Sequence, residues 1–195
     1  MLSKFWRRLN GRKTSKKPID PSAVLVDKRQ HGLHKSKVSS NAIKVIQRLN
    51  AAEHDAYVVG GGVRDILLQK CPKDFDVSTS AKPEQVRRIF RNCRLIGRRF
   101  RLAHIYFKGE IIEVSTFRGG QTSDTTLAHD NEYGSLEEDA WRRDFTVNAL
   151  YLRVSDLSIL DYTGGLADLE QRLLRIIGDA KKRYHEDPVR ILRAI

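Results

Sequence analysis

The chain has 195 residues, of which 31% are charged, and a formal net charge of +12. That length accommodates one medium domain with a hydrophobic core and an appendage, and it argues against two full domains. No apolar run reaches the roughly 18 residues that a transmembrane helix needs, which excludes a membrane-spanning protein. Cys71 and Cys93 have no metal-ligand spacing and the N-terminus lacks a secretory apolar segment, so we expect reduced thiols and a cytoplasmic location.

Most of the positive charge lies at the N-terminus. Residues 1–40 contain eleven Lys or Arg and two acids, a balance of +9, so the remaining 155 residues carry only +3. This composition, with little apolar periodicity, predicts a disordered basic arm over residues 1–40. The arm is either a solvated tail or a segment attracted to polyanions.

Short helices and strands are expected after the arm. Ser39 precedes a helical pattern of apolar residues that ends near His54. The next expected elements are a strand at 57–59, a helix at 63–69, a strand at 75–79 and a helix that begins at Pro83.

The second half of the chain continues the mixture. Apolar runs at 102–107 and 111–117 predict a hairpin, and residues 119–134 predict a mobile loop. Ser135 and the acids that follow it predict a helix start. Strands at 149–154 and 158–160, a helix at 166–173 and a helix from Pro188 complete the prediction. Without a regular βαβ repeat, these elements indicate an α+β fold around a small mixed sheet flanked by helices.

Glycines and aspartates between residues 59 and 80 give the strongest functional signal. Gly60, Gly61 and Gly62 follow an apolar strand, which would let a phosphate-bearing ligand approach the backbone. Asp74 and Asp76 are two residues apart, so on a strand they would lie on one face and could share a divalent cation such as Mg²⁺. A tight structural turn explains the glycines alone, but two like charges on one strand face repel each other without a cation.

A third carboxylate and a group of arginines extend this interpretation. Glu113, within an apolar run, either points towards the two aspartates or lies on a solvated face. Seven arginines occupy residues 87–101, either as a solvated helix face or as a track for RNA or a triphosphate, and the absence of balancing acids favours the track. Its central members are Arg94, Arg98, Arg99 and Arg101.

Two further motifs have structural and functional interpretations. Arg142, Arg143 and Asp144 follow an acidic turn, so ion pairs four residues apart explain the arginines but leave Asp144 unexplained. Asp187 and Arg190 share a helix face, where they form either a structural ion pair or a donor and acceptor pair that reads a base edge.

Four segments in this order resemble the motifs of the bacterial tRNA nucleotidyltransferase and poly(A) polymerase family, within the polymerase β-like nucleotidyltransferase superfamily. They are residues 60–65, 74–76, 142–150 and 186–190, and the resemblance covers about residues 40–195. Residues 92–104 and 110–119 are more similar to the poly(A) polymerase branch than to the CCA-adding branch.

The resemblance implies a role for each motif. Asp74 and Asp76 would bind two Mg²⁺ ions, with Glu113 as an auxiliary carboxylate, and Asp144 would be essential to activity. A further set would contact ATP: Gly61, Gly62, Arg64, Arg143, Asp187, Arg190 and Arg193. The reaction implied is transfer of AMP from ATP to RNA 3′ ends, which would associate the protein with RNA-decay machinery.

The resemblance also implies a division of the chain and leaves alternatives open. Residues 41–177 would form the catalytic head, and residues 178–195 the start of a helical neck that ends within its first helix. A CCA-adding tRNA nucleotidyltransferase would use the same groups. A shortened RNA-binding chain with little turnover is the alternative from another functional class.

Overall fold

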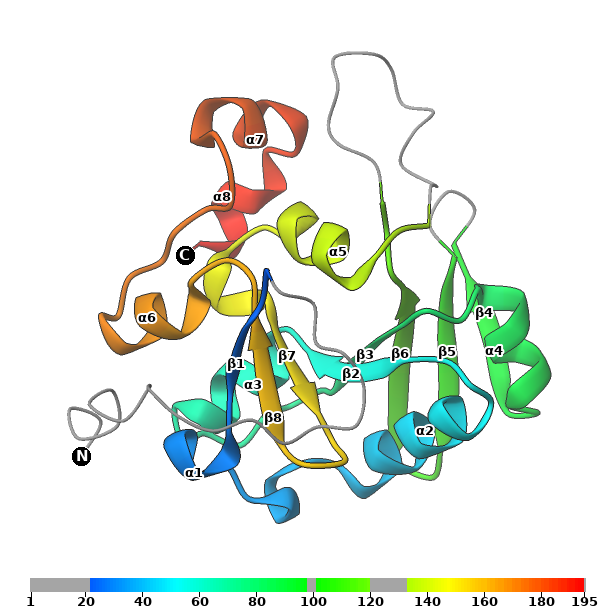
Figure 1. Ribbon diagram of the computed structural model, residues 1–195. Helices are drawn as coiled ribbons and strands as arrows, with labels where there is room; N and C mark the ends of the chain where they lie inside the picture. Colours follow the sequence, from blue (N-terminus) through cyan, green and yellow to red (C-terminus); the bar gives the residue numbers. More distant parts are fainter. Residues whose placement is uncertain (1–21, 98–100, 120–132, 195) are drawn as a thin grey trace.

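A mixed sheet runs through the computed structural model, which describes residues 22–97, 101–119 and 133–194 (Figure 1). The strands are β1 (Val24–Val26), β2 (Ala56–Val59), β3 (Asp76–Thr79), β4 (Cys93–Ile96), β5 (Leu102–Phe107), β6 (Glu110–Thr116), β7 (Leu150–Arg153) and β8 (Ser158–Asp161). Their order across the sheet is β1-β8-β7-β2-β3-β6-β5-β4. The β3–β6 pair is parallel, and the other neighbouring pairs are antiparallel.

Short helices flank this sheet. They are α1 (Lys28–His31), α2 (Ser40–Ala51), α3 (Gly61–Leu67), α4 (Pro83–Ile89), α5 (Leu136–Arg142), α6 (Gly165–Glu170), α7 (Ala180–Glu186) and α8 (Val189–Arg193). The helices α7 and α8, at the red end of the chain, lie beyond α5 and away from the sheet (Figure 1). Within the described residues, no helix is long and apolar enough to cross a membrane.

One face of the sheet forms the main core. A continuous apolar row crosses all eight strands in register: Val26, Ile159, Leu152, Val58, Val77, Val114, Ala103 and Leu95. The helices α2 and α4 cover this row with buried side chains that include Val45, Ile46 and Val86. Because side chains alternate along a strand, the neighbouring positions must point to the opposite face.

The neighbouring row on the opposite face changes from mainly apolar to polar side chains halfway across the sheet. Its members in register are Leu25, Leu160, Tyr151, Val59, Asp76, Glu113, His104 and Arg94. Under α5, Val59, Tyr151 and Leu160 pack with Ala140 in a second apolar cluster. From Asp76 onward the row is polar, so β3 marks the boundary between a covered half and a polar half of this face.

The sequence predictions hold for most elements. The α+β class, the 102–117 hairpin and the helix after Ser135 are confirmed, and the hairpin turns at Gly109, whose φ is +82°. The helix after Ser39 is also confirmed, with the Ser39 side chain accepting from the backbone of Asn41 and Ala42. The predicted loop at 119–134 lies mainly outside the described residues.

Two predictions need correction. The disordered arm was extended too far, because β1 pairs with β8 and the buried Val26 joins the core; residues 1–21 lie outside the described part of the chain. The strand β4 was not predicted; the arginine-rich stretch therefore spans both α4 and β4, where Arg94 alternates with the buried Cys93. Both strands were missed because three or four residues give too short an alternation to recognise.

Candidate nucleotidyl-transfer site

Two carboxylates lie side by side where the row becomes polar. Asp76, the first residue of β3, is in parallel register with Glu113 on β6, so both side chains point to the same face. Asp74 lies in the segment leading into β3, rather than on the strand as predicted. Crowding by neighbouring protein atoms raises the pKa of Asp76, the charges of Glu113 and Asp74 raise it further, and Arg143 opposes them.

Gly60 lies between Asp76 and Arg143. A Cβ built on Gly60 would lie 3.4 Å from Oδ2 of Asp76 and 3.9 Å from Nη1 of Arg143. The φ of Gly60 is +78°, which disfavours any residue with a side chain. Glycine at this position therefore leaves the space between the carboxylate and the guanidinium clear.

The next two glycines begin α3. A Cβ on Gly62 would lie 3.2 Å from the backbone oxygen of Asp74, so a larger residue would push against the segment that carries this carboxylate. A Cβ built on Gly61 would lie 3.4 Å from Nη2 of Arg64, so Gly61 lies beside this guanidinium. The glycine motif thus lies next to both aspartates, as the sequence predicted.

A chain of polar contacts joins Arg64 to the later motifs. Arg64 pairs with Asp65 and donates from Nη1 to Oδ1 of Asn148 at 2.8 Å. Asn148 donates in turn to Oδ1 of Asp144 at 3.3 Å, and the backbone N–H of Phe145 donates to the same oxygen at 2.7 Å. Arg193 on α8 reaches the other oxygen of Asp144 at 3.4 Å.

A buried hydrogen-bond network between α5 and the sheet fixes the Arg143 side chain. Asp139, which is 6% exposed, accepts from Tyr151 Oη at 2.7 Å, Ser78 Oγ at 3.0 Å and Arg143 Nη2 at 3.2 Å. Burial alone would lower the pKa of Arg143, but Tyr151 and Asp139 raise it above its ordinary value. Burial raises the pKa of Tyr151, with Arg143 opposing and Asp139 adding to the shift. Arg143 is therefore a fixed cation beside Asp76.

Asp187 and Arg190, predicted as a pair, contact other groups instead. Asp187 accepts from the backbone N–H of Val189 at 3.1 Å. The guanidinium of Arg190 donates to the backbone oxygen of Arg183 and to Glu186, and its side chain is only 14% exposed. Both residues therefore hold the α7–α8 turn in this structure.

The donor set suits a cation at Asp74 and Asp76. Both residues are exposed, and neither side chain has a hydrogen bond or ion pair to another described residue. Glu113 differs, because His104 Nε2 lies 3.1 Å from its Oε2. Among the described residues, no three His, Cys, Asp or Glu side chains gather into a metal-binding group, so Glu113 is a neighbour of the aspartate pair and not part of a preformed triad.

The predicted arginine track is only partly described. Arg94 is exposed on β4, and its guanidinium lies 5.6 Å from the ring centre of Tyr106. Arg101 is paired with Glu84 at 2.8 Å, so the expectation that no acid balances this group is wrong for Arg101. Arg98 and Arg99 lie outside the described residues.

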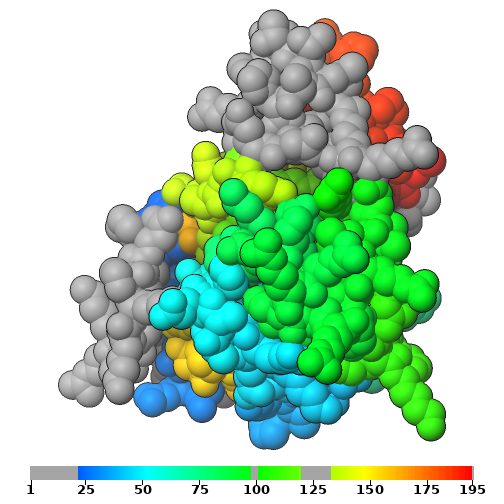
Figure 2. All heavy atoms as spheres, turned by 90° about the vertical axis from the view of Figure 1, so that its right-hand side faces the viewer, coloured from blue at the N-terminus to red at the C-terminus, as the bar shows by residue number. Residues whose placement is uncertain are grey.

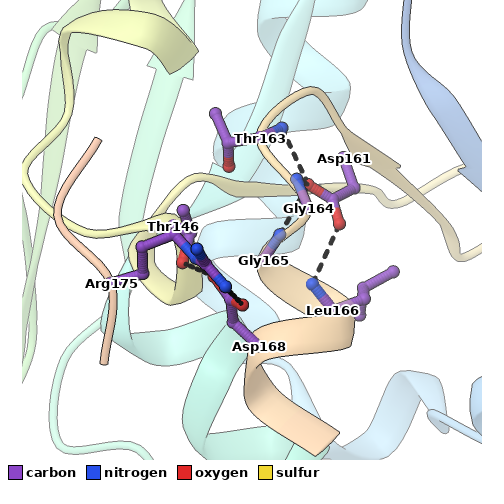
Figure 3. Close-up of polar contacts among 8 residues, drawn as sticks. All are labelled: Thr146, Asp161, Thr163, Gly164, Gly165, Leu166, Asp168 and Arg175. Atoms are coloured by element: carbon purple, nitrogen blue, oxygen red, sulfur yellow. Dashed lines mark hydrogen bonds and ion pairs between the residues drawn. The ribbon is translucent and has the colours of Figure 1, made fainter. Parts of the chain in front are cut away.

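Two buried aspartates, Asp161 and Asp168, were not predicted from the sequence, and both hold backbone turns near the site. Asp161 accepts four backbone N–H groups, from Thr163, Gly164, Gly165 and Leu166, at the turn into α6 (Figure 3). Asp168 accepts from Arg175 and from Thr146, the first residue of the turn that ends at Asn148 (Figure 3). The sequence Asp-Tyr-Thr-Gly-Gly at residues 161–165 was the signal available for Asp161. Asp168 had no comparable signal, because Arg175 lies beyond the end of α6.

Comparison with known proteins agrees with this geometry. Residues 56–175 match the model of the poly(A) polymerase head domain. The chain is 54% identical over 187 residues to Poly(A) polymerase I of Salmonella typhi, covering 90% of this chain and 40% of that protein. The chain thus spans about two fifths of the length of this relative.

Solved structures show the same fold. The Bacillus stearothermophilus CCA-adding enzyme in complex with CTP aligns with a TM-score of 0.70 at 38% identity, over 78% of this chain and 37% of that one. The Thermotoga maritima CCA-adding enzyme complexed with tRNA aligns with a TM-score of 0.67 at 26% identity, over 87% and 40% of the two chains. The matched head-domain model covers more than half of the chain and includes three of the four segments that carried the resemblance, so this chain belongs to the poly(A) polymerase head-domain family of nucleotidyltransferases.

Proposed function

We propose that this chain is the catalytic head of a polynucleotide adenylyltransferase, which joins AMP from ATP to the 3′ end of RNA. The observation that carries the proposal is the exposed Asp74 and Asp76 pair, with Gly60 and the fixed cation of Arg143 beside it. The higher identity to a poly(A) polymerase, 54% against 38% for a CCA-adding enzyme, favours ATP as the nucleotide. Such a role would place the protein in the cytoplasm, near the machinery of RNA decay.

Asp74 and Asp76 would hold two Mg²⁺ ions. Their oxygens are the hard ligands that Mg²⁺ prefers, and a bound cation would offset both the burial and the repulsion from Glu113 and Asp74 that raise the pKa of Asp76. Bound there, the ions would lower the pKa of the RNA 3′-hydroxyl and offset the charge of the triphosphate. Glu113 would add negative charge next to the pair.

The protein groups would orient the triphosphate and the RNA end. Arg143, fixed by Asp139, would face the phosphates, and Gly61 and Gly62 would let them approach the backbone near Arg64. The 3′-oxygen would attack the α-phosphorus, the bond from this phosphorus to the bridging oxygen would break, and pyrophosphate would leave while the hydroxyl proton is released. Asp144 would act by holding Asn148 and Arg193 in place.

Adenine recognition would fall to the region after α6. Asp187 could accept from the amino group of adenine, while Arg190 could donate to a ring nitrogen. In the described structure Arg190 donates to Arg183 and Glu186, so this pairing requires its guanidinium to leave α7. Because β1 belongs to the sheet, we propose a head that starts at β1 and ends near residue 177, followed by the start of a neck at residues 178–195.

Nucleotide choice tests the proposal directly. The chain is incubated with Mg²⁺ and either a short oligo(A) or a tRNA that lacks its 3′-terminal CCA, with ATP or CTP in turn. We expect AMP addition to oligo(A) and no use of CTP. Addition of CMP to the tRNA would support the CCA-adding alternative, for which the similarity to CCA-adding structures is the supporting observation.

A mutant control separates catalysis from binding. Asp74→Ala should abolish AMP addition and change RNA binding by no more than a few fold. If the parent chain binds RNA but adds no nucleotide at stoichiometric enzyme, the chain is an RNA-binding module and the proposal is wrong.

A further inference from the structure

The polar half of the site face continues outward into an exposed surface on β4, β5 and β6. We call it the β4–β6 platform and define it by Arg94, Ile96, His104, Tyr106 and Ile111. Strand alternation places these side chains on the same face as Glu113, opposite the core row. Ile96 is 42% exposed, Tyr106 37% and Ile111 48%, so no described element covers the platform.

We propose that the β4–β6 platform binds the single-stranded RNA segment that precedes the 3′ end at Asp76. This inference rests on the proposed function and deepens it. It assigns Tyr106 and Arg94 as the main contacts, with Tyr106 offering a ring to an RNA base and Arg94 a guanidinium to a base or a phosphate. The sequence already suggested an RNA contact for Arg94, and the strand pairing adds Tyr106 beside it.

The chemistry of the platform suits RNA. Single-stranded nucleic acids bind where aromatic rings for stacking lie next to cations for the backbone. The guanidinium of Arg94 lies 5.6 Å from the Tyr106 ring centre. The ring centres of His104 and Tyr106 lie 6.4 Å apart. Arg94 has no carboxylate partner among the described residues, unlike Arg101, which pairs with Glu84. Its charge is therefore available to a ligand.

The position of the platform also suits RNA. Glu113 lies between Asp76 and His104 in the same register row, and Arg94 ends that row. Three strand spacings of roughly 4.8 Å separate Asp76 from Arg94, a span that a short stretch of RNA can cross. A strand whose 3′ end reaches the aspartates can therefore continue over this exposed face.

The opposite face supplies a matched control. Between α2 and β5, Lys44, Arg48 and Phe107 line a separate hollow, and α2 packs on the core side of the sheet. The view in Figure 2 faces α2, in cyan, and the green segments that include α4 and β4. Lys44→Ala and Arg94→Ala each remove one exposed positive charge, but from opposite sides of the sheet. If RNA were held only by general attraction to a basic protein, the two substitutions would weaken RNA binding equally.

Binding of a fluorescent oligo(A), measured by anisotropy without ATP or Mg²⁺, tests the platform. We expect Tyr106→Ala to raise the Kd by about fivefold or more, since stacking on one aromatic ring is worth about 1–3 kcal/mol per base, and Tyr106→Phe to retain binding. Arg94→Ala should also weaken binding and make the slope of log K against log salt shallower by about 0.7, the value for one phosphate contact on a single strand. Tyr106→Ala should leave that slope unchanged, and Lys44→Ala should leave the Kd within about twofold.

Several outcomes would overturn the assignment. These are undetectable binding by the parent chain, parent-like binding by Tyr106→Ala with its unfolding temperature unchanged, or equal weakening by Lys44→Ala and Arg94→Ala. If Tyr106→Ala instead abolishes self-association in sedimentation without affecting RNA binding, the platform is a protein interface. Failure of the proposed function looks different: AMP addition would be absent while platform-dependent RNA binding persists.

Discussion

Arg64 and Asn148 are joined by a hydrogen bond of 2.8 Å although 84 positions separate them in the chain. The bond connects α3, which begins at the glycine motif, to the turn that follows α5. Asn148 also donates a hydrogen bond to Asp144, which in turn pairs with Arg193. The amide of Asn148 therefore orients a cation and an anion that the sequence motifs place far apart.

Replacement of Asn148 should affect nucleotide use more than folding. Asn148→Ala removes the acceptor for Arg64 and one donor to Asp144, so we expect a KM for ATP raised by about tenfold or more, the effect of losing a charge-assisted hydrogen bond of about 1.5–3 kcal/mol. Steady-state kinetics with oligo(A) measures this change. Asn50→Ala, on the exposed side of α2, is the control and should behave as the parent does. An unchanged KM would show that Arg64 needs no support from Asn148.

Removing the charge of Asp76 should separate Mg²⁺ binding from folding. The raised pKa means that the ionised carboxylate is less favourable in the folded chain than in the unfolded one, so above that pKa ionisation weakens the fold. In metal-free buffer at neutral pH, Asp76→Asn should therefore unfold at the same or a higher temperature. Added Mg²⁺ should raise the unfolding temperature of the parent and have little effect on Asp76→Asn. Glu53→Gln, an exposed acid elsewhere, should respond like the parent, and an equal Mg²⁺ response in Asp76→Asn would contradict the metal site.

Loss of Asp139 should destabilise the protein strongly. Asp139→Ala leaves the side chains of Arg143, Tyr151 and Ser78 without their shared acceptor, and breaking a buried ion pair costs about 3–5 kcal/mol. Urea unfolding at pH 7 measures the loss. Glu137→Ala, in the same helix but away from this network, should cost less than about 1 kcal/mol. A similar small loss for Asp139→Ala would mean that the network does not stabilise the fold.

The contribution of Asp168 should depend on pH. Burial alone would raise its pKa, but hydrogen bonds from Arg175 and Thr146 hold the pKa below the ordinary value of 3.8. A lowered pKa stabilises the fold above the unfolded-state value, and this stabilisation disappears as the pH falls through the folded-state value. Asp168→Asn should therefore be less stable than the parent in urea at pH 7 and pH 5, and the difference should shrink below about pH 4. A difference that stays constant down to pH 3 would point to packing instead of charge.

The local pattern predicted much of the fold because the core row is strongly apolar. Val58, Val77 and Val114 lie in runs whose alternation identified their strands, and Ser39 and Ser135 identified two helix starts. Strand order could not be predicted in this way. The parallel pairing of β3 with β6 depends on a crossover through α4, β4 and β5, which no local signal encodes.

The site was predictable to the extent that its residues form motifs. Asp74, Asp76 and the glycines were found because their spacing is unusual for structure alone. Asp139 was interpreted as part of a surface ion-pair pattern with Arg143; the ion pair exists, but it is largely buried. Burial depends on the packing of α5 against Tyr151, which sequence spacing does not reveal. For the same reason, the exposure of Tyr106 and its contact with Arg94 emerged only from the strand register.

The two register rows also bear on how substitutions will affect this protein. Sliding β3 by one residue would turn Asp76 into the core and Val77 out to solvent, so the unbroken apolar row is what fixes the alignment of the strands. Asp76, Glu113 and His104 contribute little to that alignment. Changes at these three positions should therefore leave the chain folded, whereas Val77→Asp would place a charge in the core and destabilise the fold strongly.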